Sequence, residues 1–109
     1  MSFPALPVIY APIALQELET IWDWNEAMHS RDHAVAYIAF LERHINDLAR
    51  RYAQGKAVSG RPDLRYIVIR RKTKGHGHVA VYRFNARTVE VLHVFHTAQD
   101  WPTKLTEER

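Results

Sequence analysis

The chain has 109 residues, of which 47% are hydrophobic and 25% charged. This usage is too apolar for intrinsic disorder, so we expect one domain over residues 1–109 with a modest core. The absence of cysteine excludes disulfides and thiolate metal sites, and it fits a reducing compartment. Because the proline-punctuated N-terminus lacks a basic region and no long apolar run occurs, we expect a soluble, cytoplasmic protein without a membrane span.

The net charge of +3 conceals two halves of opposite sign. Residues 1–54 carry seven acids against four Lys/Arg, a net charge of −3, whereas residues 55–109 carry five against eleven, a net charge of +6. The window from Arg50 to Arg87 contains eleven basic residues and only one acid, Asp63. Such a surface concentrates anionic partners, either nucleic acid or an acidic protein. The same charge can also serve only solubility.

The N-terminal half predicts a short edge strand followed by two helices. Residues 6–10 form an apolar run flanked by prolines, and Pro12 suits the first turn of a helix. Ser30 can cap a second helix that runs to about Ala53 and ends at Gly55. The short link between the helices predicts an antiparallel hairpin. Helical spacing predicts one buried face on the first helix: Leu15, Leu18, Ile21, Trp22, Asn25 and Met28.

The C-terminal half predicts strands. Residues 56–64 contain Gly60, Pro62 and Asp63 and are typical of a loop. Alternating patterns then predict strands over 65–72, 78–84 and 89–96, joined by short turns. The last strand is apolar on both faces (Val89, Val91 and Phe95 on one, Leu92 and Val94 on the other), which favours a central position. We therefore expect an α+β fold, an N-terminal helical hairpin packed on a small antiparallel β-sheet.

Four histidines in this half raise the possibility of a metal site. His76 and His78 could share one side of a hairpin, but glycines around His76 weaken any preformed site. His93 and His96 are three residues apart in a strand and so point to opposite faces. We expect no metal and no cofactor, and we interpret the turn histidines as solvent-exposed.

Cleavage of RNA without a metal needs a base, an acid and cations that stabilise the transition state. His96, Arg83 and Arg65 could supply these roles, supported by further basic and tyrosine residues: Tyr66, Arg70, Arg71, Lys72 and Tyr82. The same arginines can also be solvated hairpin charges, and Arg83 can pair with Glu90 across a turn. Both interpretations stay open at this point.

Two tryptophans suggest a contact with another protein. Trp22 and Trp24 are two residues apart and cannot share one helix face, so at least one should be partly exposed. An exposed tryptophan can anchor a partner chain. Alternatively, the sheet and a loop cover both rings.

Four segments in order, ELETIWDW, GRPDLRY, VYRF and VEVLHVFHTAQDW, resemble the ParE branch of the ParE/RelE toxin superfamily of type II toxin–antitoxin modules. The resemblance covers nearly the whole chain and implies the RelE/ParE-like fold. It also implies a toxin that inhibits DNA gyrase by binding, without catalysis of its own. The alternative is a RelE-like ribosome-dependent mRNA endonuclease.

Two positions separate these alternatives. His96 lies where some RelE-like toxins carry a catalytic histidine, but Thr97 follows it in place of an aromatic residue. The position that usually supplies a catalytic arginine corresponds to Val79. We therefore expect His96 to hydrogen-bond the turn at Thr97–Asp100 and Trp101 to fold back onto the sheet. His96 and Trp101 are also our candidate contacts to the target.

The resemblance further implies a ParD-like antitoxin, whose acidic tail folds onto the toxin in a hetero-oligomer. The antitoxin would supply the DNA binding, so we expect no specific DNA binding by this chain alone. The basic excess suits an acidic tail. The candidate antitoxin contacts are Trp24, Arg65, Arg70, Arg71 and Arg83.

Overall fold

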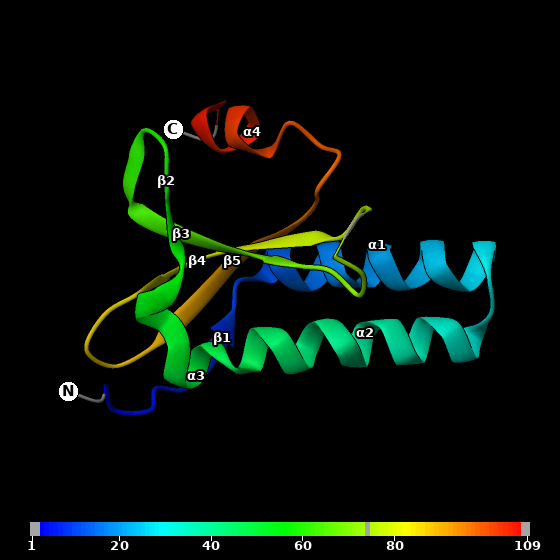
Figure 1. Cartoon of the computed structure of the whole chain (residues 1–109), viewed down its shortest axis with the longest axis horizontal. Coiled ribbons are helices and arrows are strands. Elements are labelled where there is room, and N and C mark those ends of the chain that lie inside the picture. The colour runs from blue at the N-terminus through cyan, green and yellow to red at the C-terminus, as the bar shows by residue number, and fades with distance from the viewer. Residues whose placement is uncertain (1–2, 74, 108–109) are drawn as a thin grey trace.

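The computed structural model describes residues 3–73 and 75–107, which form a sheet covered by helices on both faces (Figure 1). The helices are α1 (Pro12–Met28), α2 (Arg31–Asn46), α3 (Leu48–Arg51) and α4 (Trp101–Glu107), with a 3₁₀ turn η1 (Tyr52–Gln54) after α3. The strands are β1 (Val8–Tyr10), β2 (Lys56–Val58), β3 (Arg61–Ile69), β4 (His78–Phe84) and β5 (Val89–His96). Within the described residues, no helix combines the length and apolar character that a bilayer crossing requires.

The helical hairpin is confirmed. Pro12 opens α1, and the Ser30 hydroxyl accepts a hydrogen bond from the His33 N–H (3.1 Å) at the start of α2. The predicted second helix is interrupted at Asp47 and continues as α3 and η1 to Gln54. The expected buried face of α1 is partly wrong, because Leu15 and Met28 are 54% and 62% exposed. The helix instead turns a neighbouring face inward, so that its buried residues are Ala14, Leu18 and Asn25.

The sheet has the order β1-β5-β4-β3-β2 and is mixed. Strands β2 to β5 pair antiparallel as expected, but β1 pairs parallel with β5, with Val8 opposite Val89. The predicted edge position of β1 and central position of β5 are both confirmed. The loop expected over residues 56–64 is wrong. Lys56–Val58 form the edge strand β2, and Gly60, in the left-handed region at φ 78°, marks the turn into β3.

A β-bulge at Leu92 changes the expected faces of β5. Val81 pairs with His93 and Tyr82 with Val91, so Leu92 has no partner of its own on β4. As a result Val91 and Val94 both face the hairpin, whereas Phe95 faces the opposite side. The simple alternation that placed Val91 and Phe95 together is therefore wrong.

The core has two parts, one on each face of the sheet. The larger part lies under the helical hairpin and includes Leu41, Ile45 and Tyr82. The smaller part lies under α4, an element the sequence did not predict, and includes Val79 and the 1% exposed Leu105. Figure 1 shows α4 on the side of the sheet away from α1 and α2.

Candidate functional site

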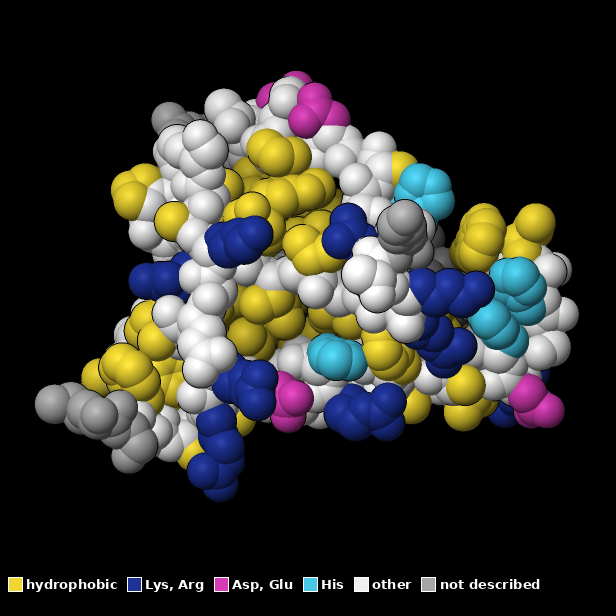
Figure 2. All heavy atoms as spheres, viewed as in Figure 1, with side chains coloured by type: hydrophobic (Ala, Val, Ile, Leu, Met, Phe, Trp, Pro, Cys, Tyr) yellow, Lys and Arg dark blue, Asp and Glu magenta, His cyan; other side chains and the backbone are white. Residues whose placement is uncertain are grey.

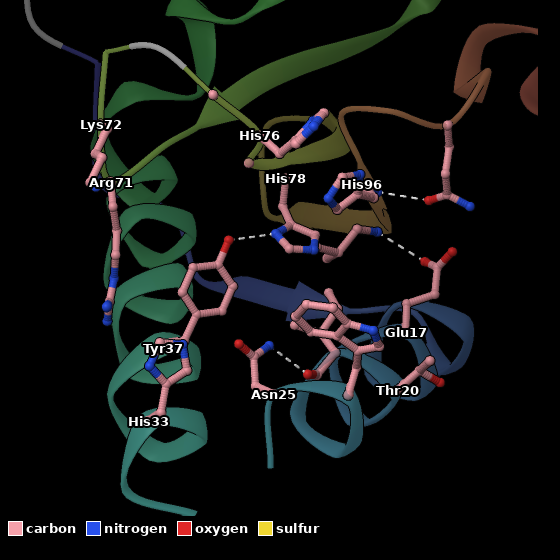
Figure 3. Close-up of a pocket in the computed structure, with 16 residues that line it drawn as sticks. Glu17, Thr20, Asn25, His33, Tyr37, Arg71, Lys72, His76, His78 and His96 are labelled. Atoms are coloured by element: carbon pink, nitrogen blue, oxygen red, sulfur yellow. Dashed lines mark hydrogen bonds between the residues drawn. The ribbon is translucent and has the colours of Figure 1, made fainter. Parts of the chain in front are cut away.

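A groove of about 750 Å³, which we call the hairpin groove, opens between the helical hairpin and the end of the sheet. Figure 3 shows His76, His78 and His96 on one side of it and Asn25 and Thr20 on the other. Five parts of the chain supply its walls: α1, α2, the segment joining β3 to β4, the start of β4, and β5 with the turn after it. Its lining residues are Glu17, Thr20, Ile21, Trp24, Asn25, His33, Tyr37, Arg71, Lys72, Gly75, His76, Gly77, His78, Val94, His96 and Gln99.

One short hydrogen bond ties the two layers together in the groove. The Tyr37 hydroxyl of α2 lies 2.6 Å from Nδ1 of His78 on β4. Burial, reinforced by the nearby His96, lowers the pKa of His78 to about 4. His78 is therefore neutral near pH 7, and its Nδ1 shares a hydrogen bond with the Tyr37 hydroxyl, whose own pKa is raised by burial. The expectation of exposed turn histidines is wrong for His78, which is 8% exposed.

Three imidazoles gather at the end of the sheet. His78 is directly opposite His96 in the β4–β5 pairing, and their ring centroids are 5.2 Å apart. The His76 ring lies 5.2 Å from that of His96. Burial and the neighbouring His76 lower the pKa of His96. Among the residues that the structure describes, no three His, Asp or Glu side chains are placed to hold a metal ion.

Glu17, the only acidic side chain among the described residues that line the groove, is occupied by structural contacts. Its carboxylate accepts a hydrogen bond from the Val94 N–H (2.9 Å) and lies 3.2 Å from Nδ1 of His93. Strand β1 ends at Tyr10 and pairs only with residues 89–91, which leaves the later part of β5 without a neighbouring strand on the side away from β4. Glu17 thus satisfies a backbone group at an open sheet edge.

Aromatic rings follow one another along the hairpin. Trp24 contacts His29, His29 contacts His33, and the His33 ring stacks parallel to Tyr37. The Arg71 guanidinium lies over the rings of Tyr37 and Phe40, 5.2 and 5.3 Å from their centroids. Figure 2 shows Lys/Arg, His and hydrophobic side chains side by side at the end of the hairpin where α1 and α2 are joined.

The candidate nuclease residues do not come together. The Arg65 Nη1 donates to the Gly55 carbonyl (2.7 Å), and Arg83 pairs with Glu90 (2.7 Å), which was one of the interpretations that the sequence left open. Both arginines are near the far end of the sheet, because Arg65 is opposite Tyr82 and Arg83 is opposite Glu90. His96 is six residues further along β5, which corresponds to roughly 20 Å at the usual rise of about 3.3 Å per residue.

The expected antitoxin contacts also fall into two groups, one at the hairpin groove and one at the far end of the sheet. Trp24, confirmed as exposed at 58%, and Arg71 line the hairpin groove. Arg70 precedes Arg71 in the chain and donates from Nε to the Gly75 carbonyl (3.1 Å). Arg65 and Arg83 are at the distant end and already have partners within the chain.

The predicted structure of the segment after β5 is confirmed. The His96 N–H donates to Gln99 Oε1 (2.7 Å), and His96 Nδ1 accepts from the Ala98 N–H (3.0 Å). The Trp101 ring packs 4.9 Å from that of Tyr66, so this segment does fold back onto the sheet. Sequence analysis did not assign His33 and Tyr37 to a site, although their four-residue spacing places both rings on one side of the second helix.

The helices and the five-stranded mixed sheet form an α+β fold that is consistent with the RelE/ParE-like class. Residues 8–101 match the family described as the ParE toxin of the type II toxin–antitoxin system parDE. Since the match spans most of the chain, the chain belongs to this family of toxins.

A solved structure described as the chromosomal ParDE TA system from P. aeruginosa is similar in fold, with a TM-score of 0.71. The comparison covers 84% of this chain and 95% of that chain at 16% identity. No curated protein matches the chain.

Proposed function

We propose that this toxin acts by binding DNA gyrase, without cutting RNA, and that a ParD-like antitoxin neutralises it. Membership in the ParE toxin family over residues 8–101 carries the proposal. The fold shared with a structure of a ParDE system is consistent with it.

The site geometry supports action by binding. Val79, at the position where nuclease relatives are expected to carry an arginine, is 2% exposed and packs in the core under α4. His96 is engaged with the turn that follows it, and burial disfavours its charged form. The two candidate arginines, Arg65 and Arg83, lie too far from His96 to act on the same phosphate.

Charge and shape support an acidic, amphipathic partner segment at the hairpin groove. In the part of the chain that the structure describes, no Asp or Glu pairs with Arg70 or Arg71. Trp24 offers an exposed aromatic anchor in the groove that Arg71 also lines. Carboxylates of the antitoxin can pair with the two guanidinium groups in bidentate geometry, while its apolar side chains contact the rings.

The target is tested by expressing the chain with and without its antitoxin. We expect growth arrest that the antitoxin relieves, loss of supercoiling by purified gyrase, and accumulation of gyrase-linked DNA breaks. Ribosomes programmed with mRNA should leave that mRNA intact. Unaffected gyrase together with position-specific mRNA cleavage, abolished by His96→Ala, would overturn the proposal in favour of a nuclease.

A further inference from the structure

The hairpin groove has the dimensions of a small-molecule site. Its volume of about 750 Å³ lies within the roughly 300–1,000 Å³ typical of ligand pockets. Polar groups converge on it from helices and sheet, as Figure 3 shows for Asn25, Tyr37, His78 and His96. A groove that only accepted an apolar helix would not need this concentration of polar groups.

Trp24 presents a ring to this groove. The indole is 58% exposed, and its only ring contact among the described residues is an edge-on one with His29, at 5.9 Å and 73°. Tyr37, in contrast, is already covered by Arg71 and hydrogen-bonded to His78. Trp24 is therefore the ring available to stack on a flat heteroaromatic ligand.

Positive charge lies along another part of the same groove. Arg71 and Lys72 line it, and no described Asp or Glu pairs with either. The Arg71 guanidinium is held over two aromatic rings. A planar guanidinium held in this way is suited to bidentate contact with a phosphate. Glu17 does not compete for these cations, because its carboxylate is engaged by His93 and the Val94 N–H.

The imidazoles of the groove can take up protons when a negatively charged ligand binds. Burial lowers the pKa of His78 and His96, and partial burial with His29 and Arg71 nearby lowers that of His33. A phosphate beside these rings favours their charged forms, so its binding is accompanied by proton uptake. The titratable and charged groups facing the groove are Glu17, His33, Tyr37, Arg71, Lys72, His76, His78 and His96.

We infer that the hairpin groove binds a nucleoside phosphate, with its base stacked on Trp24 and its phosphate held by Arg71 and Lys72. The combination of an uncovered ring, unpaired cations and protonatable imidazoles favours this ligand class over an uncharged aromatic molecule or a free anion. The site includes His96, one of the two candidate target contacts, whereas Trp101 lies outside it. It overlaps the surface proposed for the antitoxin, so the ligand and the antitoxin compete.

Calorimetric titration of the purified chain with AMP, adenosine and inorganic phosphate tests the inference. We expect saturable binding of AMP at least tenfold tighter than either fragment, with affinity higher at pH 6 than at pH 8. Repeating the titration in two buffers of different ionisation enthalpy should reveal proton uptake. Trp24→Ala and Arg71→Gln/Lys72→Gln should each weaken AMP binding at least tenfold. Leu15→Ala on the same helix and Lys56→Gln on β2, both outside the groove, should leave it unchanged.

Three outcomes would overturn the inference. They are no saturable AMP binding, binding no tighter than that of phosphate alone, and binding unaffected by Trp24→Ala. If the antitoxin binds the chain but AMP neither binds nor competes, the nucleotide site fails while the proposed function stands. If AMP binds and gyrase is unaffected, the site stands and the gyrase proposal fails.

Discussion

His78 joins two parts of the molecule that are 41 residues apart in the chain, through its hydrogen bond with Tyr37. The same burial that makes this contact possible excludes a charge on the imidazole. The unfolded chain has no such constraint, and its histidines titrate near their usual pKa of about 6.5. At any pH between the pKa of His78 in the folded chain and its pKa in the unfolded chain, folding therefore releases a proton from this residue.

This difference makes the stability depend on pH. Because the pKa of His78 is lowered to about 4, the unfolded state binds more protons than the folded state between pH 6.5 and 4. Stability is thus complete above pH 6.5 and decreases as the pH falls, by about 3 kcal/mol at most for a shift of this size. His96 and His33, whose pKa values are also lowered, act in the same direction.

We predict that His78→Gln flattens this dependence. Glutamine can still accept a hydrogen bond from Tyr37 but cannot take up a proton. Urea unfolding at several pH values between 7.5 and 4.5 would measure the effect in both proteins. An NMR titration in which the His78 ring of the native chain became protonated near pH 6.5 would contradict the prediction.

At the scale of elements, the Glu17 carboxylate accepts a hydrogen bond that a neighbouring strand would otherwise accept from β5. The open edge of β5 beyond Val91 would expose a backbone donor, and the α1 carboxylate accepts it. The same carboxylate lies beside the 5% exposed His93. Helix α1 is therefore fixed to the sheet by polar contacts as well as by the apolar core.

We predict that Glu17→Ala destabilises the fold by about 1–3 kcal/mol, the usual cost of leaving a buried donor unsatisfied. Amide hydrogen exchange at Val94 should accelerate in this variant. Glu17→Gln keeps an oxygen acceptor and should retain most of the Val94 protection. Glu19→Ala, an exposed acid on the same helix, is the control, and a loss of stability equal to that of Glu17→Ala would refute the role of the carboxylate.

Periodicity was sufficient to predict the long elements but not the short ones. Helices α1 and α2 and strands β4 and β5 each repeat an apolar pattern over seven residues or more. Strand β2 has three residues, Lys56–Val58, and it forms because it pairs with β3 and buries Val58 under α4. Helix α4 is short, and it forms because Trp101 and Leu105 contact one face of the sheet. The sequence alone does not predict which residues make up that face. The amino-acid sequence around Leu92 contains no pattern that predicts the β-bulge.

The candidate site was only partly predictable for the same reason. Composition identified the basic excess, and helical spacing predicted that at least one of Trp22 and Trp24 is partly exposed. The groove itself is assembled from residues as distant as Glu17 and Gln99, and the Tyr37–His78 contact depends on the packing of the hairpin against the sheet. The arginines formed one group in the sequence, but strand register places Arg65 and Arg83 at the opposite end from Arg71.

At the scale of the whole molecule, the charge asymmetry should control association with the antitoxin. We predict that Arg70→Glu/Arg71→Glu weakens the complex by about 2–5 kcal/mol if the pairs are buried, and slows association. Association of the unaltered chain should slow as salt rises. Stopped-flow and equilibrium measurements at two salt concentrations would check both statements.

The matched control is Arg50→Glu/Arg51→Glu, which changes the net charge equally but on α3, outside the groove. It should alter the association rate moderately and leave the dissociation rate unchanged. Binding by the Arg70/Arg71 variant equal to that of the native chain at both salt concentrations would refute a role for these arginines.

The parallel pairing of β1 with β5 also has a consequence for the order of folding. Val8 is opposite Val89, so this contact closes a loop of about eighty residues, whereas β3, β4 and β5 are joined by short connections. Closing a long loop carries an entropic cost before any contact offsets it, so local hairpins form first and distant pairings later. The first strand to leave the ribosome is therefore the last to join the sheet. Until it does, the edge of β5 stays open to other chains, and this is the stage at which the protein is most prone to aggregate.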